Sequence, residues 1–281
     1  MRRSPINWSR RGWIAALAAI CMTGTAAVGL RRRIMPKRDP SVPYRDFRLK
    51  TADGVELAAR LIPGGDRGAV VIAHPAVTGQ RFPPLLNLAE MMAAYFDVYT
   101  FDFRGHGRSG GRLELSMRGP LEDMRAVVSE VRSRNYPWVG AVGFSLGGMS
   151  AFMHAAVQGG LDAVVTVGAP PRLPDLRPYR LVLPAWSLWV RFLGARFKAV
   201  SDGGPVPVDV AGMFPDIPLL IIHGEHEAFY SREEFRSMLE DLGGRGEEWV
   251  IEGGRHTELK GRERDVVEWM AEKAALALGL L

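Results

Sequence analysis

Short apolar runs alternate with longer amphipathic runs between residues 69 and 168. Such short apolar runs are typical of strands buried on both faces of a sheet, and here they are residues 69–73, 98–103, 138–142 and 163–167. Helical spacing of apolar side chains marks the segments between or after them, residues 85–95, 121–133 and 149–157. Strands and helices that alternate in this way predict an α/β fold, with helices on both faces of a mostly parallel sheet.

The alternation is extended at both ends. Residues 47–49 and 55–62 are separated by Ala52-Asp53-Gly54, which predicts a hairpin. After residue 213 we expect strands at 219–222 and 249–251 and a closing helix at about 264–280. Between these strands, Ser231-Arg232-Glu233-Glu234 forms a capping box for a helix that runs to Leu242.

Residues 171–213 interrupt the pattern. They contain six prolines and an apolar cluster that includes Leu183, Trp186 and Trp189. A helical insertion packed against the sheet would account for this composition. A cap with an apolar lining over the active site would also account for it, and we predict a cap because a long insertion at a strand end naturally covers the site.

The motif Gly143-Phe144-Ser145-Leu146-Gly147 lies between a predicted strand and a predicted helix. A strand that turns abruptly into a helix strains the backbone of the serine at its apex and exposes the hydroxyl beside a helix N-terminus. A second match, Gly107-Arg108-Ser109-Gly110-Gly111, lies in a polar glycine-rich stretch with no helix after it. We therefore interpret Ser145 as a nucleophile and Ser109 as a loop residue.

His74, Arg104 and Ser145 each follow a predicted strand, so they should meet at one edge of the sheet. A serine nucleophile needs a base, usually histidine, and an acid that orients it. Because the acid and then the histidine follow the serine along the chain in proteins with this turn, His223, His226 and His256 are the candidate bases. His256 is the strongest, since it follows the last strand in a glycine-rich loop, while His223 is better explained as a structural turn residue.

Glu227, in the loop after the penultimate strand, is the candidate acid, and Asp175 is the alternative. Asp202 and Asp209 lie in the predicted cap and are weaker candidates. A tetrahedral oxyanion needs two backbone donors. Leu146 supplies one, and Ala76 is expected to supply the other, with Val77 second, because Pro75 has no N–H.

The amino-acid composition and charge indicate which kinds of partner the protein could bind. The chain has 281 residues, 47% hydrophobic, with a formal net charge of +5 and a pI of about 9.6. Nine lysines and arginines precede residue 40, and without them the chain is slightly acidic, which disfavours nucleic acid and favours a membrane surface. The only cysteine, Cys21, excludes an intrachain disulfide. We predict no cofactor and no metal, because no Cys/His cluster has zinc-ligand spacing.

Residues 13–30 carry no charge and have arginines on both sides. As a helix this run would span roughly 27 Å, just short of a hydrocarbon core of about 30 Å. An uncleaved single-pass anchor of undecided orientation fits best, and a cleaved signal peptide that would leave a secreted protein is the alternative. Residues 1–43 are thus predicted to be an anchor and a proline-containing tether, and residues 44–281 the folded domain.

Five motifs together resemble the α/β-hydrolase family, in its esterase, lysophospholipase-like and thioesterase-like branch. They are His74-Pro75-Ala76, Asp102-Phe103-Arg104-Gly105-His106-Gly107-Arg108-Ser109, Gly143-Phe144-Ser145-Leu146-Gly147-Gly148, His223-Gly224-Glu225-His226-Glu227 and Gly254-Arg255-His256-Thr257. They occur in the family's order over roughly residues 45–280. The resemblance implies an eight-stranded sheet, a triad of Ser145, Glu227 and His256, and a structural role for the 102–109 loop.

Two positions depart from the family's pattern. Pro75 stands where the family usually has glycine, which leaves the expected donor in place but stiffens the loop. Glu227 stands where the acid is usually aspartate, and its longer arm requires a compensating shift. The resemblance implies hydrolysis of a small-molecule carboxylic ester or thioester; a non-catalytic binding or scaffold protein and an acyltransferase are the alternatives. The sequence does not indicate the oligomeric state.

Overall fold

The computed structural model describes residues 37–114, 116–173, 195–199 and 204–281. The chain divides into two compact units, Met1–Lys37 and Arg38–Leu281. All elements below belong to the second unit. The predicted anchor at residues 13–30 lies outside the described residues, among which no helix is both long and apolar enough to cross a membrane.

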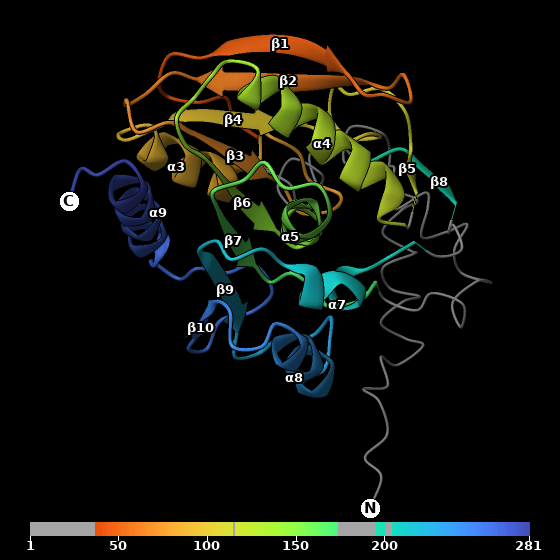
Figure 1. Ribbon diagram of the computed structural model, residues 1–281. Helices are drawn as coiled ribbons and strands as arrows, with labels where there is room; N and C mark the ends of the chain where they lie inside the picture. Colours follow the sequence, from red (N-terminus) through yellow and green to blue (C-terminus); the bar gives the residue numbers. More distant parts are fainter. Residues whose placement is uncertain (1–36, 115, 174–194, 200–203) are drawn as a thin grey trace, which may run out of the picture. The chain divides into compact units, whose positions relative to one another are not determined.

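Eight strands of the described chain form one sheet in the order β1-β2-β4-β3-β6-β7-β9-β10 (Figure 1). The first two pairings, β1 with β2 and β2 with β4, are antiparallel, and all later pairings are parallel. The strands are β1 (Arg45–Lys50), β2 (Glu56–Ile62), β3 (Ala69–Ala73), β4 (Asp97–Phe101), β6 (Val139–Phe144), β7 (Ala163–Val167), β9 (Leu219–Gly224) and β10 (Glu247–Ile251).

Helices cover both faces of the sheet, and each face has its own apolar cluster (Figure 1). On one face lie α4 (Arg118–Arg132), α5 (Leu146–Val157) and α8 (Arg232–Asp241), and on the other lie α3 (Pro83–Met92) and α9 (Glu263–Ala277). The central strands β3, β6 and β7 are buried along their whole length. Continuous burial explains why these strands are apolar runs without alternation.

The predicted α/β class is confirmed, and so is the hairpin, in which β1 and β2 pair across the turn that contains Asp53 and Gly54. The Ser231–Glu234 capping box also forms, with Ser231 Oγ accepting the Glu234 N–H. Predicted boundaries are displaced by a few residues. The strand before Ser145 extends to Phe144, so that strand and helix are separated by one residue.

Most of the predicted cap lies outside the described residues, since residues 174–194 and 200–203 fall there. Of the rest, β8 (Phe197–Ala199) pairs in parallel with β5 (Leu113–Glu114). The short helices α7 (Pro207–Val210) and η3 (Ala211–Met213) follow, and Val208 and Val210 are buried in the same cluster as α5. This end of the predicted cap is therefore part of the core.

The contact between Phe152 of α5 and Phe214 holds the C-terminal end of the predicted cap against α5. The two rings stack with centroids 4.8 Å apart, and both side chains are buried. We expect Phe152→Ala to lower the free energy of unfolding by about 3–5 kcal/mol, because it removes a ring from a packed core and leaves a cavity. Equilibrium urea denaturation measures the change.

Val157→Ala is the control on the same helix, because Val157 is 46% exposed. Its effect should stay within about 0.5 kcal/mol. Equal effects of the two substitutions would contradict the packing of residues 207–214 on α5.

Candidate active site

Ser145 lies at a strained turn between β6 and α5, with φ 50° and ψ −110°. A Cβ atom on Gly143 would lie 2.2 Å from the Gly147 carbonyl oxygen, and one on Gly147 would lie 2.3 Å from the Ala73 carbonyl oxygen. Neither position accepts a side chain without backbone movement. The two glycines of the motif thus permit the turn and bring the N-terminal end of α5 against the end of β3.

A continuous chain of hydrogen bonds joins Ser145, His256 and Glu227. His256 Nδ1 lies 2.9 and 3.0 Å from the two Glu227 carboxylate oxygens, and His256 Nε2 lies 2.9 Å from Ser145 Oγ. An ionised carboxylate only accepts, so Nδ1 carries the proton and Nε2 is free to accept the Ser145 hydroxyl proton. The site can therefore remove a proton from the serine hydroxyl.

The Glu227 carboxylate is held by more than the histidine. Its Oε1 accepts the backbone N–H groups of Ala228 and Phe229, at 2.8 and 2.9 Å. Burial alone would raise the pKa of Glu227, but the hydrogen bonds from His256 and from these two N–H groups outweigh it and lower the pKa below its usual value. Glu227 is therefore an anion at neutral pH, in spite of its burial.

Glycines allow the His256 loop to reach the strand ends. Gly168, which follows β7 with φ 59°, would place a Cβ atom 3.2 Å from His256 Nδ1. Gly224, at the end of β9, would place one 2.5 Å from the Gly254 carbonyl oxygen. The loop that carries His256 thus packs directly on the backbone of two neighbouring strands.

The other two candidate histidines lie elsewhere. His223 belongs to β9 rather than to a turn, and its Nε2 lies 2.7 Å from the Glu248 carboxylate on β10. The side chain of His226 is exposed, while its backbone N–H donates to the Gly254 carbonyl. Of the alternative acids, Asp175 and Asp202 lie outside the described residues, and Asp209 caps α7 by accepting the Val206 N–H.

The three candidate oxyanion donors differ in whether their backbone N–H groups already have an acceptor. These donors are Leu146, Ala76 and Val77. Leu146 is the first residue of α5, so its N–H has no acceptor within the helix. The Ala76 N–H makes no backbone hydrogen bond within the described chain. The Val77 N–H, in contrast, donates to His106 Nε2 at 3.1 Å. Of the two candidates after β3, only the Ala76 amide is thus left for a ligand.

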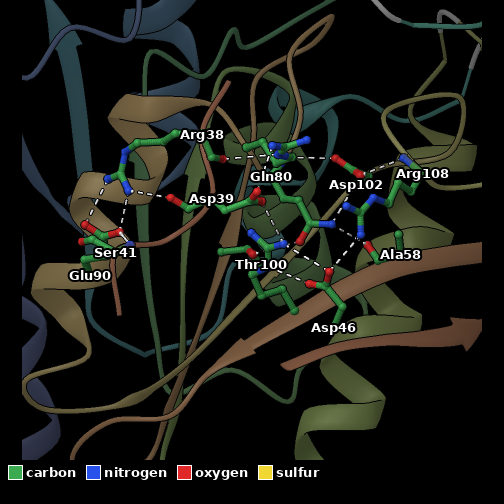
Figure 2. A network of polar contacts seen from close by, with 12 residues as sticks. Arg38, Asp39, Ser41, Asp46, Ala58, Gln80, Glu90, Thr100, Asp102 and Arg108 are labelled. Atoms are coloured by element: carbon green, nitrogen blue, oxygen red, sulfur yellow. Dashed lines mark hydrogen bonds and ion pairs between the residues drawn. The ribbon is translucent and has the colours of Figure 1, made fainter. Parts of the chain in front are cut away.

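The 102–109 loop has a structural role. Asp102 accepts the backbone N–H groups of Gln80 and Arg108, and Figure 2 shows Gln80 between Asp102 and Thr100. Ser109, in the second serine motif, is buried; its Oγ donates to the Asp102 carbonyl and accepts the Ala58 N–H. The prediction of Ser109 as a loop residue is confirmed.

Arg104 connects this loop to two other elements. It pairs with the buried Asp123 of α4 and with Asp53 in the β1–β2 turn. Burial raises the pKa of Asp123 to about 6, although Arg104 opposes the shift. Arg104 was expected at the ligand edge, but its guanidinium is fully engaged in holding the loop to α4 and the hairpin.

Phe229 is a site residue that the sequence pattern did not reveal. Its ring lies against the His256 imidazole, with centroids 4.1 Å apart, and 57% of the residue is exposed. Its position two residues after Glu227 could have revealed it. The turn around the Glu227 carboxylate is short, so a residue at that distance lies beside the site. Phe229 gives the base one apolar neighbour that faces solvent.

Comparison with known proteins supports the fold. A family model described as serine aminopeptidase, S33, matches residues 66–205. The structure is similar to an esterase from Pyrococcus furiosus, with a TM-score of 0.66 and 20% identity over 85% of this chain and 96% of that chain. It is also similar to an α/β hydrolase from Penicillium sp. sh18, with a TM-score of 0.67 and 16% identity over 85% and 100% of the two chains.

A third similar structure, an α/β hydrolase from Novosphingobium aromaticivorans, has a TM-score of 0.62 and 17% identity over 83% of this chain and 99% of that chain. A search of curated protein sequences gave no match. The fold and the family model identify the chain as an α/β-hydrolase of the serine-hydrolase type, and hence as an enzyme.

The lowered pKa of Glu227 makes stability depend on pH. The folded-state pKa lies below the usual value of a glutamate, so the ionised carboxylate stabilises the fold at pH values above that usual value, and this contribution is lost as the pH falls through the folded-state pKa. We expect the difference in unfolding free energy between wild type and Glu227→Gln to persist above the usual pKa of glutamate and to shrink as the pH falls through the folded-state pKa of Glu227. Urea denaturation at a series of pH values measures it.

Glu240→Gln, at an exposed position on α8, is the control for a general charge effect. Its difference from wild type should change little over the same pH range. A Glu227→Gln difference that grows as the pH falls through the range in which the carboxylate titrates would contradict the hydrogen-bond account of the carboxylate.

Proposed function

We propose that the protein hydrolyses carboxylic esters or thioesters of small molecules through an acyl-enzyme intermediate. The observation that carries the proposal is the hydrogen-bonded chain from Ser145 Oγ through His256 to Glu227. In the proposed reaction, Ser145 is the nucleophile, His256 the general base and then acid, and Glu227 the group that orients the imidazole and stabilises its positive form.

In the first half of the reaction, Ser145 Oγ attacks the acyl carbon while His256 Nε2 takes the hydroxyl proton. The carbonyl oxygen becomes an oxyanion that the Leu146 and Ala76 N–H groups stabilise, close to the positive end of α5. The tetrahedral intermediate then collapses, the bond to the leaving oxygen or sulfur breaks, and His256 gives that atom the proton. In the second half, water replaces the alcohol or thiol and releases the acid.

The ester and thioester assignment rests on the site and on the similarity to an esterase of known structure. The family model favours a second candidate, cleavage of an N-terminal amino acid from a peptide, because its description is that of an aminopeptidase. A panel of p-nitrophenyl esters, acyl thioesters and aminoacyl p-nitroanilides, varied in acyl length, separates the two.

The two serine motifs supply a matched test of the nucleophile. A fluorophosphonate probe should label the wild-type protein and the Ser109→Ala variant, but should not label Ser145→Ala, because Ser109 is buried and bonded to the backbone. In-gel fluorescence and mass spectrometry of the labelled peptide report the result. Labelling that survives Ser145→Ala would refute the proposal.

The acid is tested by comparing Glu227→Gln with Asp175→Asn. We expect Glu227→Gln to lower kcat by about 10²–10⁴-fold, since an amide cannot stabilise the imidazolium or hold its tautomer. Asp175→Asn should leave kcat within about threefold of wild type, a much smaller effect than loss of a triad acid. Steady-state kinetics on the best ester of the panel measures both, and the reverse pattern would assign the acid to Asp175.

A further inference from the structure

Two buried histidines connect the loop after β3 with the loop after β4. His74 Nε2 accepts the Phe103 N–H at 3.0 Å, and His106 Nε2 accepts the Val77 N–H at 3.1 Å. Each imidazole therefore belongs to one loop and accepts a backbone hydrogen bond from the other. The rings meet edge to face, with centroids 4.9 Å apart, and neither residue has any exposed surface.

The hydrogen-bond partners define the tautomer of His106. Its Nδ1 lies 3.0 Å from the Arg104 carbonyl oxygen, which only accepts, so Nδ1 carries the proton and Nε2 is the acceptor. Burial lowers the pKa of His106 to about 3, so the ring is neutral at neutral pH. A protonated Nε2 would instead direct an N–H at the Val77 N–H.

Val77 has an unusual backbone conformation that the His106 bond helps to hold. Its φ is 59°, in the left-handed region that a β-branched residue rarely adopts. Such strain persists only where the surroundings impose it. The residue immediately before Val77 is Ala76, whose N–H is the proposed oxyanion donor.

From this geometry we propose that His106 is a positioning residue for the oxyanion hole. By accepting the Val77 N–H it occupies that amide and holds the loop turn, so that the Ala76 N–H is the one presented beside Ser145. The proposal rests on the proposed function, because it concerns the stabilisation of that reaction's tetrahedral intermediate. Under this proposal, the loop of residues 102–109 positions the oxyanion hole in addition to stabilising the fold.

Two substitutions separate positioning from general stability. His106→Asn keeps a donor for the Arg104 carbonyl but is too short to accept from Val77, whereas His106→Gln can reach Val77 with its carbonyl oxygen. We expect His106→Asn to lower kcat by about 10- to 100-fold with KM changed by less than about threefold, since an oxyanion donor acts in the transition state. His106→Gln should recover most of kcat.

A trifluoromethyl ketone analogue of the best substrate provides the second readout. Its inhibition constant should rise with the loss of kcat in His106→Asn, while that of an unreactive alcohol analogue should not change. An Asn variant that folds, as thermal denaturation reports, and retains wild-type kcat would overturn the inference. Wild-type protein that neither reacts with fluorophosphonate nor hydrolyses any substrate would instead refute the proposed function.

Amide hydrogen exchange at single-residue resolution tests the inference in the unsubstituted protein. The Val77 amide should exchange slowly with or without the trifluoromethyl ketone, because His106 holds it in both states. The Ala76 amide should exchange faster when free and gain protection when the ketone binds. Fast exchange at Val77, or protection gained there rather than at Ala76, would overturn the inference whether or not the variants fold.

Discussion

The architecture of the site depends on one close backbone approach, between Gly147 at the start of α5 and the carbonyl of Ala73 at the end of β3. A single methyl group at Gly147 would separate them, because its Cβ atom would lie 2.3 Å from that oxygen. This contact places the loop after β3 beside the turn that carries Ser145. The nucleophile and the candidate oxyanion donors, which are about 70 residues apart in the sequence, are neighbours for this reason.

The structure contains histidines of two kinds, and their surroundings distinguish them. His256 is partly exposed, and its two ring nitrogens lie between a hydroxyl and an anion. His74 and His106 are fully buried and bonded to backbone groups, and they join two loops. The same side chain bonds two polar side chains in one place and joins two backbone segments in the other, and at His106 burial lowers the pKa, so that ring stays neutral.

The order and type of the elements could be predicted because strand and helix periodicities are local properties of the chain, and continuous burial of β3, β6 and β7 makes them apolar throughout. The contact of Ser145 with His256 was also foreseeable, since both follow parallel strands. Three features were not: the positive φ of Val77, the partner of His106, and the packing of Phe214 on α5. Each depends on a contact between residues far apart in sequence, which no local pattern encodes.

Described residues of the insertion after β7 attach it to the rest of the fold through backbone hydrogen bonds. The Val208 N–H donates to the Pro171 carbonyl and closes the base, while Arg196 exchanges backbone hydrogen bonds with Gly105 and Leu113. Since lengthening a closed loop adds only a small entropic cost, the interior can change in length and composition with little effect on the closed base. The attachment of the insertion to the rest of the fold and the sequence between its attachment points can therefore change separately.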